Sequence, residues 1–335
     1  MRREMNKIKI TSKHKHTNPI IIDKESFAPG ESGTISINVG RLPSDTKINL
    51  TAHVYRSKNP GPVLLLLGGV HGDEINGVEI IRRILDKDTL QPIQRGTIIA
   101  IPLLNVFGFI NFSRDVPDGK DVNRSFPGSM SGSLASRVAR TLTKKILPYV
   151  DVALDFHTGG ASRYNYPQIR YAKSSPVAEQ LARAFAPPFI LVKPLIPKSF
   201  RKTCMSMGIP AIVYEAGESI RLCGVSIEKG ISGIMRVLNK LEMIDIETQD
   251  EPEVMLFKKS LWLRAPYSGM FIWSKQSGAR ILKGEQLGVI KDPFGTKSVK
   301  VFAKIDGYIV GHNNASVVNQ GDALFHIGIE EERIK

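Results

Sequence analysis

The chain has 335 residues, of which 42% are hydrophobic and 23% charged, and its formal net charge is +14. This length suggests about two domains with room for a substantial core, while no apolar run reaches the roughly 20 residues that a membrane helix needs. Two cysteines argue against a disulfide framework, and no apolar stretch follows the basic first residues. We therefore expect no signal peptide, no membrane partner and a cytoplasmic location.

The positive charge is spread along the chain. Lys/Arg pairs occur at 82–83, 144–145 and 258–259, but there is no long basic run and none of the aromatic interleaving that RNA-binding proteins use. We therefore expect no nucleic-acid partner, and a positive field around a site for anionic substrates fits the charge. Residues 1–24 are predicted to form a basic N-terminal arm, solvated from Lys7 to His16.

The next part of the chain predicts a hairpin followed by an α/β domain. Residues 27–57 alternate in the manner of strands around a turn at 42–45, which indicates a β-hairpin. Strands are then predicted at 63–67, 97–103, 152–156, 169–172 and 211–214, and helices at 74–85, 133–147, 176–185 and 226–241. Fully apolar strands separated by helices indicate a mostly parallel or mixed sheet with helices on both faces. The predicted fold class is α/β.

The last part of the chain predicts a smaller all-β domain. An acidic stretch with a proline indicates a linker at 247–259, and short strands bounded by glycines follow over 260–335. Two related pieces, 264–271 and 301–309, form a weak internal repeat that is similar to the biotinyl/lipoyl-type barrel-sandwich domain. Lys297 and Lys300 lack the Met-Lys-Met context of a lysine that carries a prosthetic group. We expect a structural or assembly role for this domain.

Three metal-competent side chains, His71, His157 and Glu215, each follow a predicted strand directly. The segment 64–74 runs from an apolar strand through a glycine turn to His71 and Glu74, and His157 ends another strand. Imidazole nitrogen and carboxylate oxygen bind Zn²⁺, and a catalytic zinc site takes three protein ligands and leaves one position open. The His71/Glu74 pair alone is a weak signal, because the helix dipole also favours a glutamate at a helix start. Ligands in α/β sheets collect at the carboxyl ends of the strands, so His71, His157 and Glu215 are expected at one edge.

Four motifs together resemble one enzyme family. GGVHGDE at 68–74, DVNRSFPG at 121–128, DFHTG at 155–159 and a glutamate at the end of a strand, Glu215, occur in this order. Their types and order are similar to those of the zinc carboxypeptidase clan, in particular the succinylglutamate desuccinylase/aspartoacylase family, over about residues 50–240. The resemblance implies a zinc-hydrolase domain at 25–246, including the hairpin, and one Zn²⁺ per chain held by His71, Glu74 and His157.

The resemblance also implies the catalytic roles. Glu215 would be the general base that moves a proton from water to the leaving amine, and Arg114 would polarise the scissile carbonyl. Glu218 competes with Glu215 for the base role, but Glu215 comes directly off the apolar strand. Asp155 shares a strand face with His157, and contact with the metal region or a salt bridge would each explain it.

Residues 121–124 supply the remaining roles that the resemblance implies. Asp121 would hold a ligand histidine in its tautomer, and Asn123 and Arg124 would grip a substrate carboxylate, for which the guanidinium fork is suited. Neutralisation of Asp121 by Arg124 is the simpler alternative.

The implied function is that of a zinc-dependent amide hydrolase, which removes an N-acyl group from a small anionic amino acid or derivative. Members of the family act on succinyl-glutamate, acetyl-aspartate and acetylated diaminobutyrate, and nothing in the sequence selects among them. Three alternatives stay open: a metallocarboxypeptidase or peptide amidase, a non-catalytic zinc-binding protein of the same fold, and a lipoyl-like carrier fused to a hydrolase. The oligomeric state is open as well.

Overall fold

The computed structural model describes residues 7–13, 15–42, 44–86, 90, 93–246 and 253–334. The predicted arm residues 1–6 and 14, and the predicted linker residues 247–252, lie outside this part of the chain. None of the helices in the described ranges combines the length and the apolar character that a bilayer-spanning helix requires.

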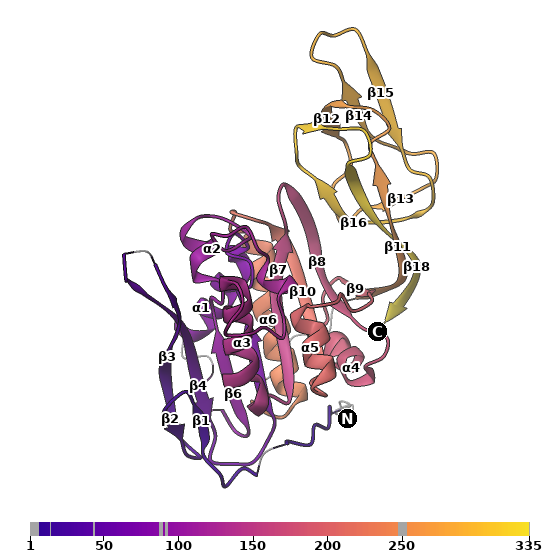
Figure 1. The fold of residues 1–335 in the computed structure, drawn as a ribbon. Coiled ribbons are helices and arrows are strands. Elements are labelled where there is room, and N and C mark those ends of the chain that lie inside the picture. Colours follow the sequence, from indigo (N-terminus) through magenta and orange to yellow (C-terminus); the bar gives the residue numbers. More distant parts are fainter. Residues whose placement is uncertain are drawn as a thin grey trace, which may run out of the picture.

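A twelve-stranded mixed sheet forms the centre of the molecule (Figure 1), with the strand order β13-β16-β18-β11-β9-β8-β10-β7-β5-β6-β4-β3. Its middle consists of β6 (Thr97–Ile101), β5 (Val63–Leu67), β7 (Val152–Gly159), β10 (Ala211–Glu218), β8 (Arg163–Tyr171) and β9 (Phe189–Val192). β6, β5, β7 and β10 run parallel, whereas β8 is antiparallel to β10. The parallel strands therefore end at the same edge of the sheet.

Helices cover both faces of this sheet. α1 (Ile75–Asp86), α4 (Pro176–Phe185) and α6 (Gly224–Lys240) pack on one face, while α3 (Leu134–Lys145), α5 (Phe200–Ser206) and α2 (Val106–Ile110) lie on the other. In β5, Leu64 and Leu66 pack under α1, α4 and α6, whereas Leu65 and Leu67 pack under α2, α3 and α5. The side chains alternate because successive residues of a strand face opposite sides of the sheet. The predicted α/β class with helices on both faces is confirmed.

The N-terminal strands extend one side of the sheet. β3 (Ser32–Arg41) and β4 (Lys47–Arg56) form the predicted hairpin, and β1 (Ile20–Ile22) pairs with β2 (Glu25–Phe27). The solvated arm is wrong at Ile8, which is buried against α6 and donates its backbone N–H to the Lys240 carbonyl. Burial of the apolar Ile8 side chain is favourable although lysines flank it, because burial removes apolar surface from water.

The C-terminal strands continue the same sheet and add a second one. β11 (Val254–Arg264), β18 (Ala323–Ile334), β16 (Gly307–Asn313) and β13 (Arg280–Ile281) extend the large sheet, and β15 (Ser298–Phe302), β14 (Gln286–Lys291), β12 (Gly269–Trp273) and β17 (Val317–Val318) form a four-stranded antiparallel sheet. In Figure 1 these strands project beyond the helical body, to which β11 and β18 connect them. The predicted all-β character is confirmed, whereas the likeness to a biotinyl/lipoyl-type domain stays a prediction.

The predicted linker does not extend past residue 253. Residues 254–259 belong to β11, which pairs in parallel with β9 through Met255, Leu256 and Phe257. These three side chains are buried, so the apolar run behind the acidic stretch is a sheet strand. The proposed division into domains at this point stays a prediction.

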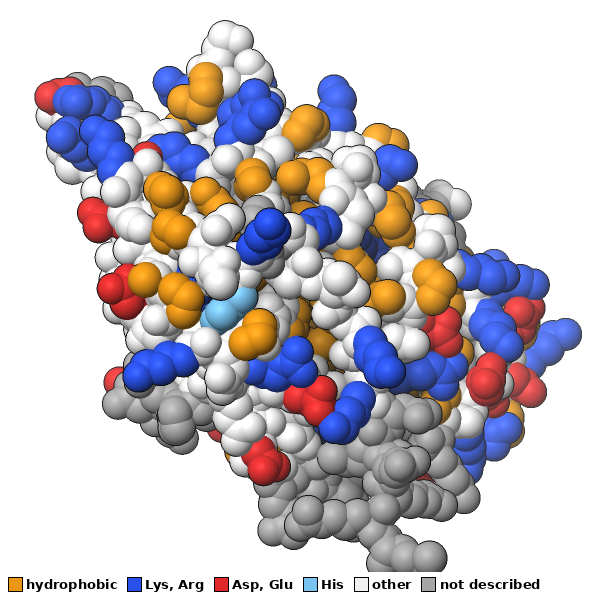
Figure 2. Space-filling model, turned by 90° about the horizontal axis from the view of Figure 1, so that it is seen from below, with side chains coloured by type: hydrophobic (Ala, Val, Ile, Leu, Met, Phe, Trp, Pro, Cys, Tyr) orange, Lys and Arg blue, Asp and Glu red, His pale blue; other side chains and the backbone are white. Residues whose placement is uncertain are grey.

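The basic residues on one face of the molecule do not form a single patch. Figure 2 shows the face opposite the C-terminal strands, where Lys and Arg side chains lie scattered among apolar and acidic ones and do not gather in one place. The charge of +14 is therefore not concentrated in a single patch on this face.

Candidate metal and active site

His71 and Glu74 lie on the turn between β5 and α1. Gly69 has a φ of 57°, and a Cβ there would lie 2.6 Å from Leu103 Cδ1, so only glycine fits this turn without strain. Glu74 immediately precedes α1, which begins one residue later than the predicted helix at 74–85. His157 lies in the neighbouring parallel strand β7, which brings it to the same edge.

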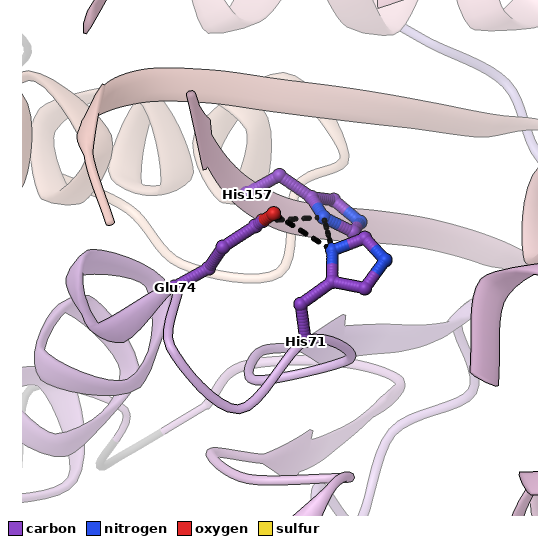
Figure 3. A group of neighbouring side chains, drawn as sticks. All are labelled: His71, Glu74 and His157. Atoms are coloured by element: carbon purple, nitrogen blue, oxygen red, sulfur yellow. Dashed lines mark hydrogen bonds and ion pairs between the residues drawn. The ribbon is translucent and has the colours of Figure 1, made fainter. Parts of the chain in front are cut away.

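The three side chains point toward one another (Figure 3). His71 Nδ1 lies 2.8 Å from Glu74 Oε1, and His157 Nδ1 lies 2.8 Å from Glu74 Oε2. The two Nδ1 atoms are 3.1 Å apart. All three residues are at least 95% buried. Two imidazole nitrogens and one carboxylate therefore share a small volume at the edge of the sheet.

A second carboxylate stands behind each histidine. Asp121 Oδ1 lies 3.2 Å from His71 Nε2, and Asp155 Oδ2 lies 2.9 Å from His157 Nε2. Each histidine can donate its Nε2–H to a carboxylate, which leaves Nδ1 with a lone pair that faces the other histidine. Asp155, whose function the sequence left open, thus contacts His157.

The cluster fits a divalent cation. Burial lowers the pKa of His157, but Asp155 and Glu74 outweigh burial and raise this pKa well above its ordinary value. The same negative surroundings that hold a proton in the metal-free chain would stabilise a metal ion. Two lone pairs 3.1 Å apart repel each other unless a proton or a cation lies between them. The donor set of two imidazoles and a carboxylate is one that zinc accepts, and the cavity described below leaves a fourth side open.

Arg114 bridges the cluster and Asp121. Its Nη1 donates to Glu74 Oε1 at 2.9 Å and its Nη2 donates to Asp121 Oδ2 at 3.0 Å. Burial lowers the pKa of Arg114, and the carboxylates of Glu74 and Asp121 outweigh this effect and raise it. The guanidinium therefore stays charged beside the open side of the metal cluster.

Glu215 lies next to His157 in the neighbouring strand. β10 and β7 place these two residues side by side, and the Glu215 carboxylate accepts from Asn165 Nδ2 at 2.7 Å and from Arg170 Nη1 at 2.8 Å. Glu215 lines the cavity. Glu218, the competing residue, instead accepts from Asn314 Nδ2 at 2.5 Å in the C-terminal region and does not line this cavity.

Asn123 and Arg124 belong to a short 3₁₀ helix (Val122–Arg124) that Asp121 caps. Asn123 Oδ1 accepts from Phe200 N at 2.9 Å, which fixes the amide at the edge of the cavity. Arg124 donates to the Asn123 carbonyl and is exposed. The ion-pair partners of Asp121 among the described residues are Arg114 and His71, so neutralisation does not explain Arg124.

These side chains line a single cavity of about 460 Å³. The lining residues that were not predicted from the sequence include Arg170, Arg201 and Trp262. Arg201 is 9% exposed, its Nη2 donates to the Pro194 carbonyl, and its Nη1 has no partner in the described part of the chain. No local pattern marks these residues, because they come from three separate segments that meet only in the folded chain.

Comparison with known proteins agrees with this geometry. The sequence model of the succinylglutamate desuccinylase/aspartoacylase catalytic domain matches residues 60–241, more than half of the chain. An N-alpha-acetyl-L-2,4-diaminobutyric acid deacetylase from Halomonas elongata is 27% identical over 286 residues, which cover 80% of this chain and 82% of the relative.

Two solved structures share the fold. A succinylglutamate desuccinylase/aspartoacylase from Rhodobacter sphaeroides has 25% identity and a TM-score of 0.78, covering 91% of this chain and 96% of its own. The product-bound ectoine utilization protein EutE (DoeB) from Ruegeria pomeroyi has 22% identity and a TM-score of 0.82, covering 94% and 100%. The chain belongs to the succinylglutamate desuccinylase/aspartoacylase family.

Proposed function

We propose that this protein is a zinc-dependent amide hydrolase that removes an N-acyl group from a small anionic amino acid or amino-acid derivative. The observation that carries the proposal is the buried His71/Glu74/His157 cluster, which opens on a cavity with the Glu215 carboxylate beside it. The deacetylase from Halomonas elongata, whose name describes hydrolysis of an N-acetyl amide, supports the reaction type.

The three clustered side chains would hold one zinc ion. A bound zinc ion supplies a Lewis acid that polarises the amide carbonyl and acidifies water. Asp121 and Asp155 hold the two imidazoles with Nδ1 toward the metal position. This prior orientation reduces the reorganisation that metal binding requires.

Glu215 would move the proton during hydrolysis. Its carboxylate takes a proton from the attacking water and then gives it to the departing amine nitrogen, which makes the amine a stable leaving group. Asn165 and Arg170 hold the carboxylate in place.

The arginines of the cavity would bind the negative charges of the substrate. Arg114, beside the metal position, stabilises the charge that develops on the carbonyl oxygen in the transition state. Arg124 and Arg201 form no ion pair among the described residues, so both can donate hydrogen bonds to the substrate carboxylate. A small N-acyl amino acid suits this cavity better than a peptide does. The cavity has a volume of about 460 Å³, and Trp262 of β11, in the C-terminal region, lines one side of it.

The test is to measure zinc content and the release of free amine from N-acetyl and N-succinyl amino acids. We expect about one zinc per chain, and loss of most of this zinc in His157→Ala but not in His53→Ala, whose half-buried histidine lies outside the site. Glu215→Gln should lower kcat at least about 100-fold with the zinc retained. Its matched control, Glu218→Gln, should change kcat less than about threefold, because that carboxylate contacts Asn314.

Two results would contradict the proposal. Protein that binds no zinc after reconstitution would exclude the mechanism. Zinc-loaded protein in which Glu218→Gln, and not Glu215→Gln, abolishes hydrolysis would exclude the assigned base.

A further inference from the structure

One wall of the cavity comes from the C-terminal region. Trp262, on β11, lines the cavity and is 38% exposed, and Ile196 on the segment between β9 and α5 lines it at 45% exposure. Most other lining side chains are charged or polar. Trp262 and Ile196 therefore supply large apolar surface in a cavity that is otherwise suited to charged groups.

The Trp262 ring is held in a fixed position. It stacks on His326 of the paired strand β18, with ring centroids 4.5 Å apart and an interplanar angle of 13°. His326 is 2% exposed, and its Nε2 lies 2.9 Å from Ser260 Oγ and 3.3 Å from Lys193 Nζ. One face of the indole is covered by this imidazole, and the exposed remainder of the side chain borders the cavity.

The segment between β9 and α5 connects this wall to the proposed carboxylate grip. Near its start, Lys193 donates to Ser260, two residues before Trp262. At its end, the Phe200 backbone N–H donates to Asn123 Oδ1 at 2.9 Å. This segment thus links the neighbourhood of Trp262 to Asn123, and both residues line the one cavity.

Positively charged side chains lie in and near this cavity: Arg170 and Arg201 line it, and Lys193 Nζ lies 3.3 Å from Nε2 of the His326 ring that stacks on Trp262. Burial and the nearby Arg170 lower the pKa of Lys193 to about 8, and burial, followed by Arg170, lowers the pKa of Arg201 to about 10. The Glu215 carboxylate offsets Arg170, with which it is paired, and Asp155 lies on His157. Glu74 and Asp121 pair with Arg114, whereas Arg201 forms no ion pair among the described residues. An ammonium group beside Arg201 would therefore meet repulsion.

We propose that Trp262 is a specificity-determining residue that packs against the side chain of the amino-acid half of the substrate, where the surrounding cations favour an uncharged or acidic side chain over an ammonium. This inference rests on the proposed function, since it takes the substrate to be an N-acyl amino acid. It assigns to the C-terminal region a part in substrate selection.

The kinetic test compares wild type with Trp262→Ala on N-acetylglycine, N-acetylmethionine, N-acetylglutamate and N-acetyl-2,4-diaminobutyrate. For N-acetylmethionine we expect KM to rise about tenfold in the variant, the size of effect expected when one apolar contact is lost. We expect kcat to change less than about threefold. N-acetylglycine, which has no side chain to contact the indole, should change less than about twofold. Trp262→Phe should recover most of the lost affinity, because it restores a ring.

Two kinetic outcomes would overturn the inference. An equal loss on N-acetylglycine and N-acetylmethionine would mean that Trp262 has only a structural role. Wild-type kcat/KM for N-acetyl-2,4-diaminobutyrate above that for N-acetylmethionine and N-acetylglutamate would refute the selection against an ammonium.

A binding test does not depend on turnover. The chain has two tryptophans, so Trp273→Phe leaves Trp262 as the sole indole reporter. Titration of zinc-loaded Trp273→Phe/Glu215→Gln with N-acetylmethionine should shift its emission, whereas Trp262→Phe/Glu215→Gln should show no shift. Calorimetric binding without an emission change, or no binding, would overturn the inference. An emission shift in a protein that hydrolyses no N-acyl amino acid would instead contradict the proposed function alone.

Discussion

At the scale of single residues, paired carboxylates determine what the candidate site can bind. Asp121 and Asp155 each contact the Nε2 of one histidine, and Glu74 contacts both Nδ1 atoms. A histidine without such a carboxylate partner could offer either ring nitrogen to a metal ion. Its side chain would then lose conformational entropy when the metal binds. The site is thus oriented for a cation by groups that need not touch it.

Lys193 gives a pH-dependent contribution to stability. Its pKa is about 8 in the folded chain and 10.5 ordinarily, so between these values the unfolded chain binds more protons than the folded one. The free energy of unfolding therefore rises with pH from about 8 to 10.5 through this group, and this gain is lost as pH falls from 10.5 to about 8. We expect urea unfolding over pH 7–10.5 to show that the free energy of unfolding of wild type, minus that of Lys193→Met, increases with pH. Parallel curves would show that Lys193 titrates normally.

At the scale of elements, the turn between β5 and α1 sets the position of two of the proposed ligands. The strand ends with Leu67, the chain reverses at Gly69, and Glu74 precedes the helix. Gly72 also approaches α2 closely, since a Cβ there would lie 2.0 Å from the Gly108 carbonyl carbon. The glycines of this motif thus position the ligands without binding anything themselves.

Gly69→Ala should damage both stability and the site. The positive φ and the contact of a Cβ with Leu103 predict a loss of about 1–3 kcal/mol in the free energy of unfolding and a weaker affinity for zinc, because His71 is two residues away. Urea unfolding and a zinc titration would measure both effects. Gly224→Ala is the matched control, since a Cβ there meets no atom within 4 Å, and it should change stability by less than about 0.5 kcal/mol. Equal effects of the two substitutions would contradict the assignment.

At the scale of the whole molecule, the large sheet joins the N-terminal, central and C-terminal strands. β11 pairs with β9, and β16 pairs with β8 through Gly311 and Asn165. Asn314 additionally contacts Glu218 at the end of β10. The C-terminal strands therefore support the cavity from one side, although most of the proposed chemistry lies on the central strands.

Phe257→Ala should show how strongly this junction stabilises the chain. Phe257 is 1% exposed and its ring lies 5.1 Å from Phe189 and 5.7 Å from Tyr308. Truncation should cost about 3–5 kcal/mol in the free energy of unfolding, measured by urea denaturation. The control Phe294→Ala removes a ring that is 86% exposed and should cost less than about 0.5 kcal/mol. A cost below 1 kcal/mol for Phe257→Ala would indicate that the C-terminal strands contribute little to the stability of the junction.

The sequence by itself determined the elements that local physics specifies. The apolar run at β5 and the predicted bounds of α4 follow from periodicity and from helix-start signals such as Ser175 followed by Pro176. The strand β9 and the helix α5 were not predicted. The positions of His71, Glu74, His157 and Glu215 at one sheet edge follow from the same pattern, because parallel strands end together.

Only the tertiary structure decided which distant side chains meet. That Asp155 contacts His157, that Glu218 contacts Asn314, and that Arg201 and Trp262 line the cavity depend on segments far apart in the chain. The strand at 254–259 was missed for a related reason. Its neighbours β9 and β18 bury its apolar side chains, and nothing local in the sequence reveals these partners, which lie about 65 residues before it and about 70 to 80 residues after it.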